Sequence, residues 1–120
     1  NLSVVLTYGG NYTITTNQPR YLNVYVGAGF SKMITVTGDR LLPELRLKAG
    51  NAVWLNDDNV INLNDANLVG TQWGGPGSAS LTIDHGDVNF DNKVNIQDLA
   101  LVGGNYELTS AGAYGTTWVP

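Results

Sequence analysis

The chain has 120 residues, of which 42% are hydrophobic, a formal net charge of −4 and no cysteine. This length suits one domain or two very small ones, and the lack of cysteine excludes disulfides, thiolate metal sites and a cysteine nucleophile. Its six Lys and Arg residues form no cluster that would neutralise phosphates, and no apolar run reaches the ~20 residues of a transmembrane helix. Nucleic acid and a membrane span are therefore not expected.

The first 49 residues are predicted to form short β-strands. Apolar and polar residues alternate there, as at Leu22, Asn23 and Val24, and turn-type residues separate the alternating runs. The expected strands lie near residues 3–8, 12–16, 21–27, 31–38 and 44–48, a spacing that favours a small antiparallel sandwich. Because so small a sheet buries too little surface to be stable alone, it should lean on the back half, on an upstream segment or on another copy of the chain.

Residues 87–98, DVNFDNKVNIQD, concentrate oxygen-bearing side chains in a twelve-residue run. EF-hand-type loops bind calcium through positions 1, 3, 5, 9 and 12 and through the backbone carbonyl at position 7. Carboxylates gathered this closely would repel one another without a cation, so calcium explains the cluster better than turn formation alone. Position 6, usually Gly, is Asn92, the best non-glycine resident of the left-handed backbone region. The candidate ligands are Asp87, Asn89, Asp91, the carbonyl of Lys93, Asn95 and Asp98.

The same frame recurs thirty-three residues earlier, which indicates a duplicated unit. Strict spacing puts Trp54 at position 1 of this first loop, where it cannot bind calcium. One solution aligns Gly50-Asn51-Ala52 with Gly86-Asp87-Val88 and treats residues 53–55 as an insertion, so that Asn51 supplies the oxygen. Otherwise Asp57 or water takes that position, or the site is weak or empty. The candidate ligands here are Asn51, Asn56, Asp58, the carbonyl of Val60, Asn62 and Asp65.

A short helix is predicted after each loop, over residues 63–71 and 96–105, while neither loop is clearly preceded by one. The predicted fold class is α+β: a sandwich-like front at 1–49, two loop-helix units at 50–106 and a tail at 107–120. The tail lacks helical periodicity. Trp118 is expected either to fold back onto the module, near Trp54 or Trp73, or to reach a neighbouring molecule.

Two tandem loop-helix units with Asp at position 12 resemble a dockerin domain. The resemblance rests on NDDNVINLNDANLVG and DVNFDNKVNIQDLALVGG, joined by a linker around residues 74–77, and it covers residues 50–106. The strands ahead, through PELRLKAG, look like the end of a carboxypeptidase-regulatory-like or Ig-like repeat.

The resemblance implies a secreted, non-catalytic attachment module that two calcium ions fold and that docks onto a cohesin. It places the partner-selecting residues at loop positions 10 and 11, which here depart from the Ser-Thr pair of the best-known cellulosomal type. An apolar residue at position 10 is either an interface anchor or part of the local core. These positions hold Leu63, Asn64, Ile96 and Gln97.

The sequence also bears on three other functions. A self-assembling subunit of an extracellular fibre or surface layer would explain a β-rich front that is too small to close alone. A carbohydrate-binding module would use the many aromatic residues as a stacking surface, although aromatic packing in a small core is the better default. Catalysis is not expected, because the only histidine, His85, lies in a His-Gly-Asp turn without a Ser or Cys motif. The aromatic residues in question are Tyr8, Tyr12, Tyr21, Tyr25, Trp73, Tyr106, Tyr114 and Trp118.

Overall fold

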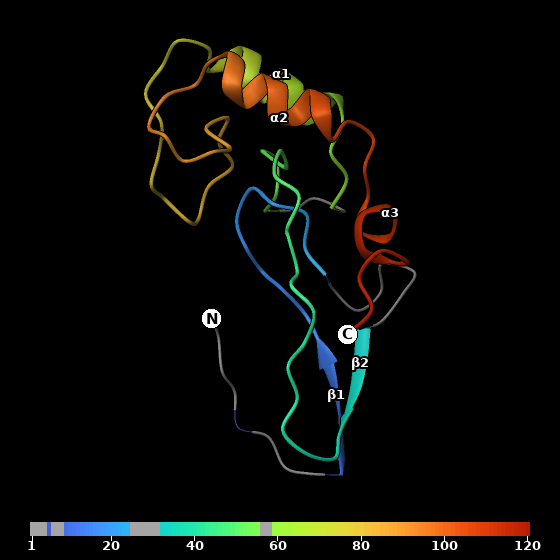
Figure 1. The fold of residues 1–120 in the computed structure, drawn as a ribbon. Coiled ribbons are helices and arrows are strands. Elements are labelled where there is room, and N and C mark those ends of the chain that lie inside the picture. The colour runs from blue at the N-terminus through green and yellow to red at the C-terminus, as the bar shows by residue number, and fades with distance from the viewer. Residues whose placement is uncertain (1–4, 6–8, 25–31, 56–58) are drawn as a thin grey trace.

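The computed structural model describes residues 5, 9–24, 32–55 and 59–120. Its elements are strands β1 (Gly10–Ile14) and β2 (Lys32–Val36) and helices α1 (Leu63–Thr71), α2 (Ile96–Gly104) and α3 (Ser110–Tyr114). The molecule is elongated, 51 × 25 × 22 Å, with α1 and α2 side by side at one end and the β1–β2 sheet at the other (Figure 1). The predicted mixed α+β class is confirmed.

The sheet has two antiparallel strands among the described residues, with Gly10 opposite Val36 and Ile14 opposite Lys32. In β2 the residues alternate between buried and exposed, as the sequence pattern predicts. The predicted strands near 12–16 and 31–38 therefore exist with shifted ends, whereas 3–8 and the second half of 21–27 fall mainly or wholly on residues that are not described.

The prediction of a strand at 44–48 is wrong. Among the described residues of the front, this segment pairs only at its end, where Leu22 donates its N–H to the Lys48 carbonyl and Tyr21 forms an isolated bridge with Ala49. Leu45 and Leu47 alternate because they pack against the hydrophobic core, and not because they lie on one face of a sheet. No second sheet faces the first in the described part of the chain, so the structure does not show a sandwich.

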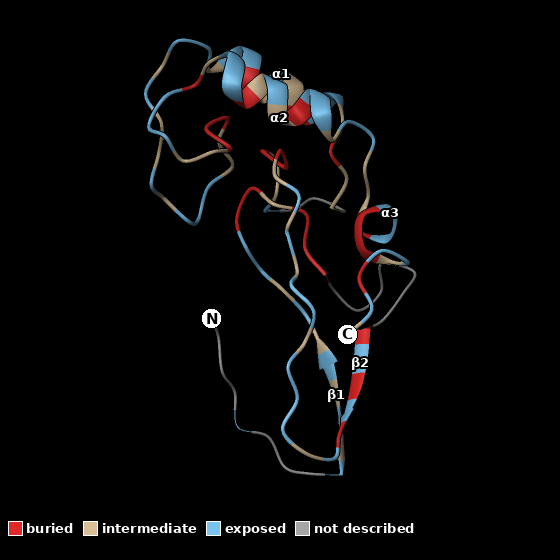
Figure 2. Ribbon diagram, in the orientation of Figure 1, coloured by how far each residue is buried: buried red, intermediate tan, exposed pale blue. Residues whose placement is uncertain are grey.

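One hydrophobic cluster draws on all three predicted segments. Its buried members are Leu22 and Val24 from the front, Ile61, Val69, Val94 and Val102 from the loop-helix units, and Ala113 and Tyr114 from the tail. Figure 2 shows buried stretches in the connecting segments as well as on the helices and β2. The front thus leans on the back half of the same chain, one of the three supports considered for it.

The tail holds the front against the loop-helix units. Helix α3 has only five residues, too few to show a helical periodicity in the sequence. It starts after Thr109, whose side chain accepts the Gly112 N–H at 3.0 Å. Trp118 is buried and its indole N–H donates to the Pro43 carbonyl at 3.1 Å. The buried ammonium of Lys32 in β2 donates to the carbonyls of Gly115 and Trp118.

The buried hydroxyl of Tyr114 bonds to two backbone groups at once, and a Tyr114→Phe variant tests how much these bonds stabilise the fold. The buried hydroxyl donates to the Leu22 carbonyl and accepts the Lys48 N–H, each at 2.8 Å. Removing it leaves both backbone groups without this partner and is expected to lower the unfolding free energy by about 1–3 kcal/mol, measured by urea denaturation. Tyr106→Phe, at a half-exposed tyrosine, should change it by less than ~0.5 kcal/mol.

Because of the same hydroxyl, the stability of the fold is expected to decrease at alkaline pH. Burial raises the pKa of Tyr114 above its ordinary value of 10.0. The neutral phenol therefore contributes stability that is complete below pH ~10 and is lost as the pH rises through the folded-state pKa. Wild-type stability should fall more steeply above pH ~10 than that of Tyr114→Phe, and parallel pH profiles would contradict this assignment.

Candidate metal centre

Three carboxylates of the second loop converge. Asp87, Asp91 and Asp98 each place one oxygen within 4.8 Å of the others. Asp87 and Asp98 are 1% and 0% exposed, whereas Asp91 is exposed and leaves the cluster open to solvent. The ion pair seen among the described residues, Arg46 with Glu44, lies elsewhere. Buried carboxylates at this spacing favour nearby positive charge, which the buried guanidinium of Arg20 supplies in part, and a hard divalent cation with oxygen ligands would suit them too.

Backbone N–H groups of the loop hold these carboxylates in place. Asp98, the third residue of α2, accepts from Val88 and from Asn95, both at 2.9 Å. Asp87 accepts from Asp91 and Asn92, both at 3.1 Å. Burial raises the pKa of Asp98 and the nearby Asp87 adds to this, while the backbone hydrogen bonds act in the opposite direction. A bound cation would relieve the cost of keeping Asp98 ionised.

The first loop repeats this scaffold. Asp65 is fully buried and accepts from the Val53 N–H at 2.9 Å and from the Asn62 N–H at 2.8 Å. Burial raises the pKa of this carboxyl as well. Position 6 is left-handed in both loops, with φ of 57° at Asn59 and 70° at Asn92, so the expectation for Asn92 is confirmed.

The entrance to the first loop favours one of the alignments left open by the sequence. The Ala52 N–H bonds to the Gly50 carbonyl at 3.0 Å, as the Val88 N–H bonds to the Gly86 carbonyl at 3.0 Å. Asn51 and Asp87 between them are both buried, so Asn51 stands in the place of Asp87. In this alignment Trp54 lies in the insertion, and its indole N–H donates to the Ile83 carbonyl at 2.9 Å. The proposed ligands Asn56 and Asp58, and Asp57, lie outside the described residues.

The remaining proposed ligands have other contacts that are compatible with a loop of this kind. Asn62 and Asn95 cap α1 and α2, each accepting the N–H of the residue two positions on at 2.9 Å. The Asn89 amide oxygen accepts the Asp91 N–H at 3.2 Å. An amide oxygen has a second lone pair, so these bonds do not exclude a metal. The backbone at position 7 is bridged in both loops, Val60 with Thr109 and Lys93 with Pro76.

The two units interlock. Ile61 at position 8 of the first loop bonds through its N–H to Leu108, after α2, at 3.0 Å, and Val94 of the second loop bonds to Gly75, after α1, at 3.2 Å. Gly50 and Gly86 also press on the opposite helices, since a Cβ on either would lie 3.0–3.2 Å from the backbone of Val102 or Val69. Each loop is therefore tied to the helix or the following segment of the other unit.

Two residues beside the second loop were missed by the sequence analysis. Gly77 has no room for a side chain, because a Cβ would overlap the Asp87 carboxylate and the Asn92 backbone. Arg20 is fully buried and its guanidinium donates to the backbone carbonyl of Asp87 in the loop. Gly77 lies in the glycine-rich linker that the sequence indicates around residues 74–77, whereas no local sequence pattern singles out Arg20. His85, expected to be structural, accepts the Asp87 N–H on Nδ1 at 3.1 Å.

Gly77→Ala is expected to distort the second loop. Because the overlap involves backbone, the loop must shift, at a cost of about 1–3 kcal/mol of unfolding free energy and with weaker calcium binding. Gly103→Ala in α2 is the matched control, since a Cβ there meets nothing within 4 Å and Ala favours helix. Thermal melts in calcium should separate the two variants, and equal melting temperatures would contradict the close packing at Gly77.

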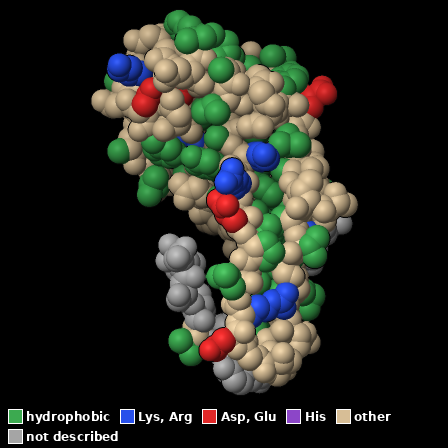
Figure 3. All heavy atoms as spheres, in the orientation of Figure 1, with side chains coloured by type: hydrophobic (Ala, Val, Ile, Leu, Met, Phe, Trp, Pro, Cys, Tyr) green, Lys and Arg blue, Asp and Glu red, His purple; other side chains and the backbone are tan. Residues whose placement is uncertain are grey.

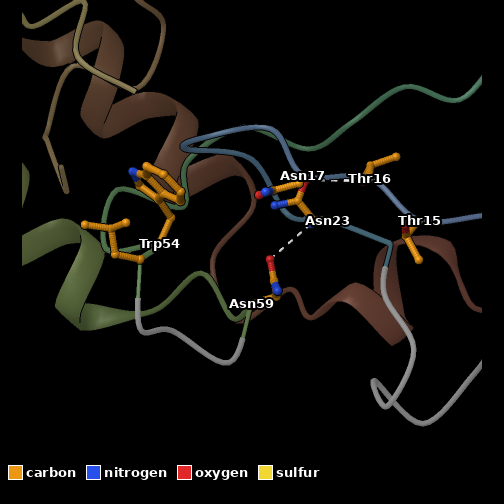
Figure 4. Close-up of a pocket in the computed structure, with 7 residues that line it drawn as sticks. Thr15, Thr16, Asn17, Asn23, Trp54 and Asn59 are labelled. Carbon is orange, nitrogen blue, oxygen red and sulfur yellow. Dashed lines mark hydrogen bonds between the residues drawn. The ribbon is translucent and has the colours of Figure 1, made fainter. Parts of the chain in front are cut away.

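A hollow lies where the front meets the first loop (Figure 4). Much of its polar lining is already engaged internally. The Asn23 side-chain oxygen accepts from Thr16 and from Gln18, and the Asn23 N–H donates to the Asn59 side-chain oxygen at 3.1 Å. Of the aromatic residues considered for sugar stacking, Tyr114 and Trp118 are buried, while Tyr8 and Tyr25 are not described. The lining residues are Thr15, Thr16, Asn17, Asn23, Trp54, Leu55 and Asn59.

The residues at loop positions 10 and 11 begin each helix and are exposed. Leu63 and Ile96 are 59% and 63% exposed, and Asn64 and Gln97 beside them are exposed too. Burial in the local core, the alternative for the two apolar residues, is therefore wrong. Figure 3 shows hydrophobic side chains on the surface of the helical end of the molecule.

No family model and no curated protein matches this sequence. Two solved structures do resemble it, a C-terminal and an N-terminal interface mutant of a type II cohesin–X-dockerin complex from Acetivibrio cellulolyticus. The likeness covers 88% of this chain and 67% of the matched chain in each case, with TM-scores of 0.56 and 0.55 and identities of 21% and 22%. The chains share a fold. Because 88% of this chain is covered, the cohesin–dockerin-related likeness extends beyond the loop-helix pair into the front. Among the described residues, no helix is long and apolar enough to cross a membrane.

Proposed function

We propose that the chain is a dockerin-like attachment module that binds calcium and docks onto a cohesin-type protein. The observation that carries the proposal is the duplicated scaffold: in each unit the position-12 aspartate is buried and is the third residue of a helix whose first two residues are exposed. The fold that the chain shares with a cohesin–X-dockerin complex is consistent with it.

Calcium is the proposed organiser of both loops. In the second loop the ligands would be Asp87, Asn89, Asp91, the Lys93 carbonyl, Asn95 and Asp98, of which three already converge as carboxylates. In the first they would be Asn51, Asn56, Asp58, the Val60 carbonyl, Asn62 and Asp65. This set has fewer carboxylates, so the first site should be the weaker one. Because the carboxylate ligands must be ionised to bind calcium and the two units interlock, metal binding and folding should be coupled.

The proposed docking face is formed by the starts of α1 and α2. Leu63 and Ile96 offer apolar side chains and Asn64 and Gln97 offer amides, and no described contact buries them. An apolar anchor flanked by polar groups is typical of a protein interface. The module would be extracellular and non-catalytic, as attachment modules of this kind are. The fibre-subunit and carbohydrate hypotheses have no comparable support in the described residues.

Capture on immobilised cohesins tests the proposal. A panel that includes type II cohesins should retain the chain in millimolar Ca²⁺ and release it when the calcium is chelated with EDTA. Size-exclusion chromatography of the unbound chain should give a monomer. Failure of every cohesin to retain a calcium-loaded, folded chain, or elution as long polymers, would count against a docking function.

A further inference from the structure

Arg20 connects the front of the chain to the second loop through its side chain. The residue is 0% exposed, and its guanidinium donates to the Asp87 carbonyl at 2.7 Å and to the Ser80 carbonyl at 3.1 Å. The guanidinium carbon also lies 4.2 Å from the centre of the Phe90 ring. Position 1 and position 4 of the loop are thus both fixed by one side chain that comes from outside it.

The backbone of Arg20 reaches the first loop. Its carbonyl accepts the N–H groups of Gly50 and Asn51, both at 3.1 Å. Arg20 itself has a φ of 67°, an unusual conformation for a residue with a long side chain. One residue therefore contacts position 1 of both loops, Asn51 through its carbonyl and Asp87 through its guanidinium.

The chemistry of these contacts favours a role in shaping the site. The guanidinium donates to the Asp87 carbonyl, while the Asp87 carboxylate accepts the N–H groups of Asp91 and Asn92 and keeps one oxygen within 4.8 Å of the carboxylate oxygens of Asp91 and Asp98. A planar fork that bonds two separate carbonyls and stacks on an aromatic ring fixes orientation in a way that an ammonium does not. Burying this cation is costly, and the nearby negative charges of Asp87 and Asp98 offset part of that cost.

We propose that Arg20 is a positioning residue for the second calcium site, holding the backbone of Asp87 in the position that calcium binding requires. The inference rests on the proposed calcium binding. It makes the front segment part of the metal site, although the front supplies none of the proposed ligands.

The test is calcium affinity by isothermal titration calorimetry, together with thermal melts in calcium and in EDTA. Arg20→Met should weaken calcium binding by about 10-fold or more, the usual effect of losing a group that orients a ligand. Arg20→Lys keeps the charge without the fork and should be weakened to a similar degree. Arg46→Met, at an exposed arginine paired with Glu44, should bind as the wild type does.

A purely structural role would lower the melting temperature equally with and without calcium and leave the calcium affinity unchanged, which would overturn the inference. Full rescue by Arg20→Lys would overturn it too, because charge alone would then suffice. If Arg20→Met does not fold, the calcium affinity of Phe90→Leu tests the inference instead. Removing the stacking ring should weaken calcium binding in the same direction, and unchanged binding would refute the inference. Wild-type protein that binds no calcium would instead refute the proposed function on which the inference rests.

Discussion

Replacing Asp98 with Asn is expected to lower the calcium affinity of the second loop by about 100-fold, or ~2.7 kcal/mol. Asp98 is the buried carboxylate at position 12, within 4.8 Å of Asp87 and Asp91, and the change removes one full negative charge from the ligand set. The amide nitrogen also cannot accept a hydrogen bond, so either the Val88 or the Asn95 N–H loses its partner.

The effect on stability should depend on calcium. Burial already raises the pKa of Asp98, so without metal the neutral amide removes a poorly solvated charge and offsets part of the lost hydrogen bond. The melting temperature of Asp98→Asn should therefore fall strongly in calcium and little in EDTA. The control is Asp39→Asn, an exposed carboxylate outside both loops. Equal losses in the two buffers would show that Asp98 acts only as a helix-capping residue.

Introducing charge at the starts of both helices is expected to weaken docking strongly while leaving the fold intact. In the double variant Leu63→Asp and Ile96→Asp, two exposed apolar side chains become carboxylates. Losing a central apolar anchor costs about 2 kcal/mol or more, so cohesin affinity should fall at least ~30-fold. Calcium affinity should stay within about threefold, since neither side chain is a proposed ligand.

The control for this surface is Leu41→Asp. Leu41 is 97% exposed and belongs to the front, so its replacement should leave cohesin capture unchanged. Surface plasmon resonance on an immobilised cohesin measures both variants. Capture that survives the double substitution and is lost in Leu41→Asp would move the docking surface from the helical end to the front.

The loop-helix units were the most predictable part of the molecule. Helix α1 was predicted with its observed ends and α2 with an end one residue too long, because Asn62 and Asn95 cap both helices where the loop frame places them. Exposure of position 10 was not predictable, since a short apolar run has the same sequence pattern whether it faces the core or a partner.

The front, and the residues that contact the second loop from elsewhere in the chain, were predicted less well because they depend on contacts between distant parts of the sequence. Alternation of apolar and polar residues shows that one side of a segment is buried, but it does not show what that side packs against. Leu45 and Leu47 therefore suggested a strand, although their segment packs against the core without forming one. Arg20 reaches Asp87 across 67 positions of the chain, a distance over which no local pattern carries information. The choice of Asn51 as the counterpart of Asp87 likewise needed the matching turns at Gly50 and Gly86.

The most direct experiment is a calcium titration of the chelator-stripped chain by isothermal titration calorimetry. Saturable binding of Ca²⁺, with the stronger site lost in Asp98→Asn and the melting temperature rising on saturation, is the predicted result. A folded chain that gives no binding heat over a range of temperatures up to millimolar Ca²⁺, and that melts identically in calcium and EDTA, would contradict the account.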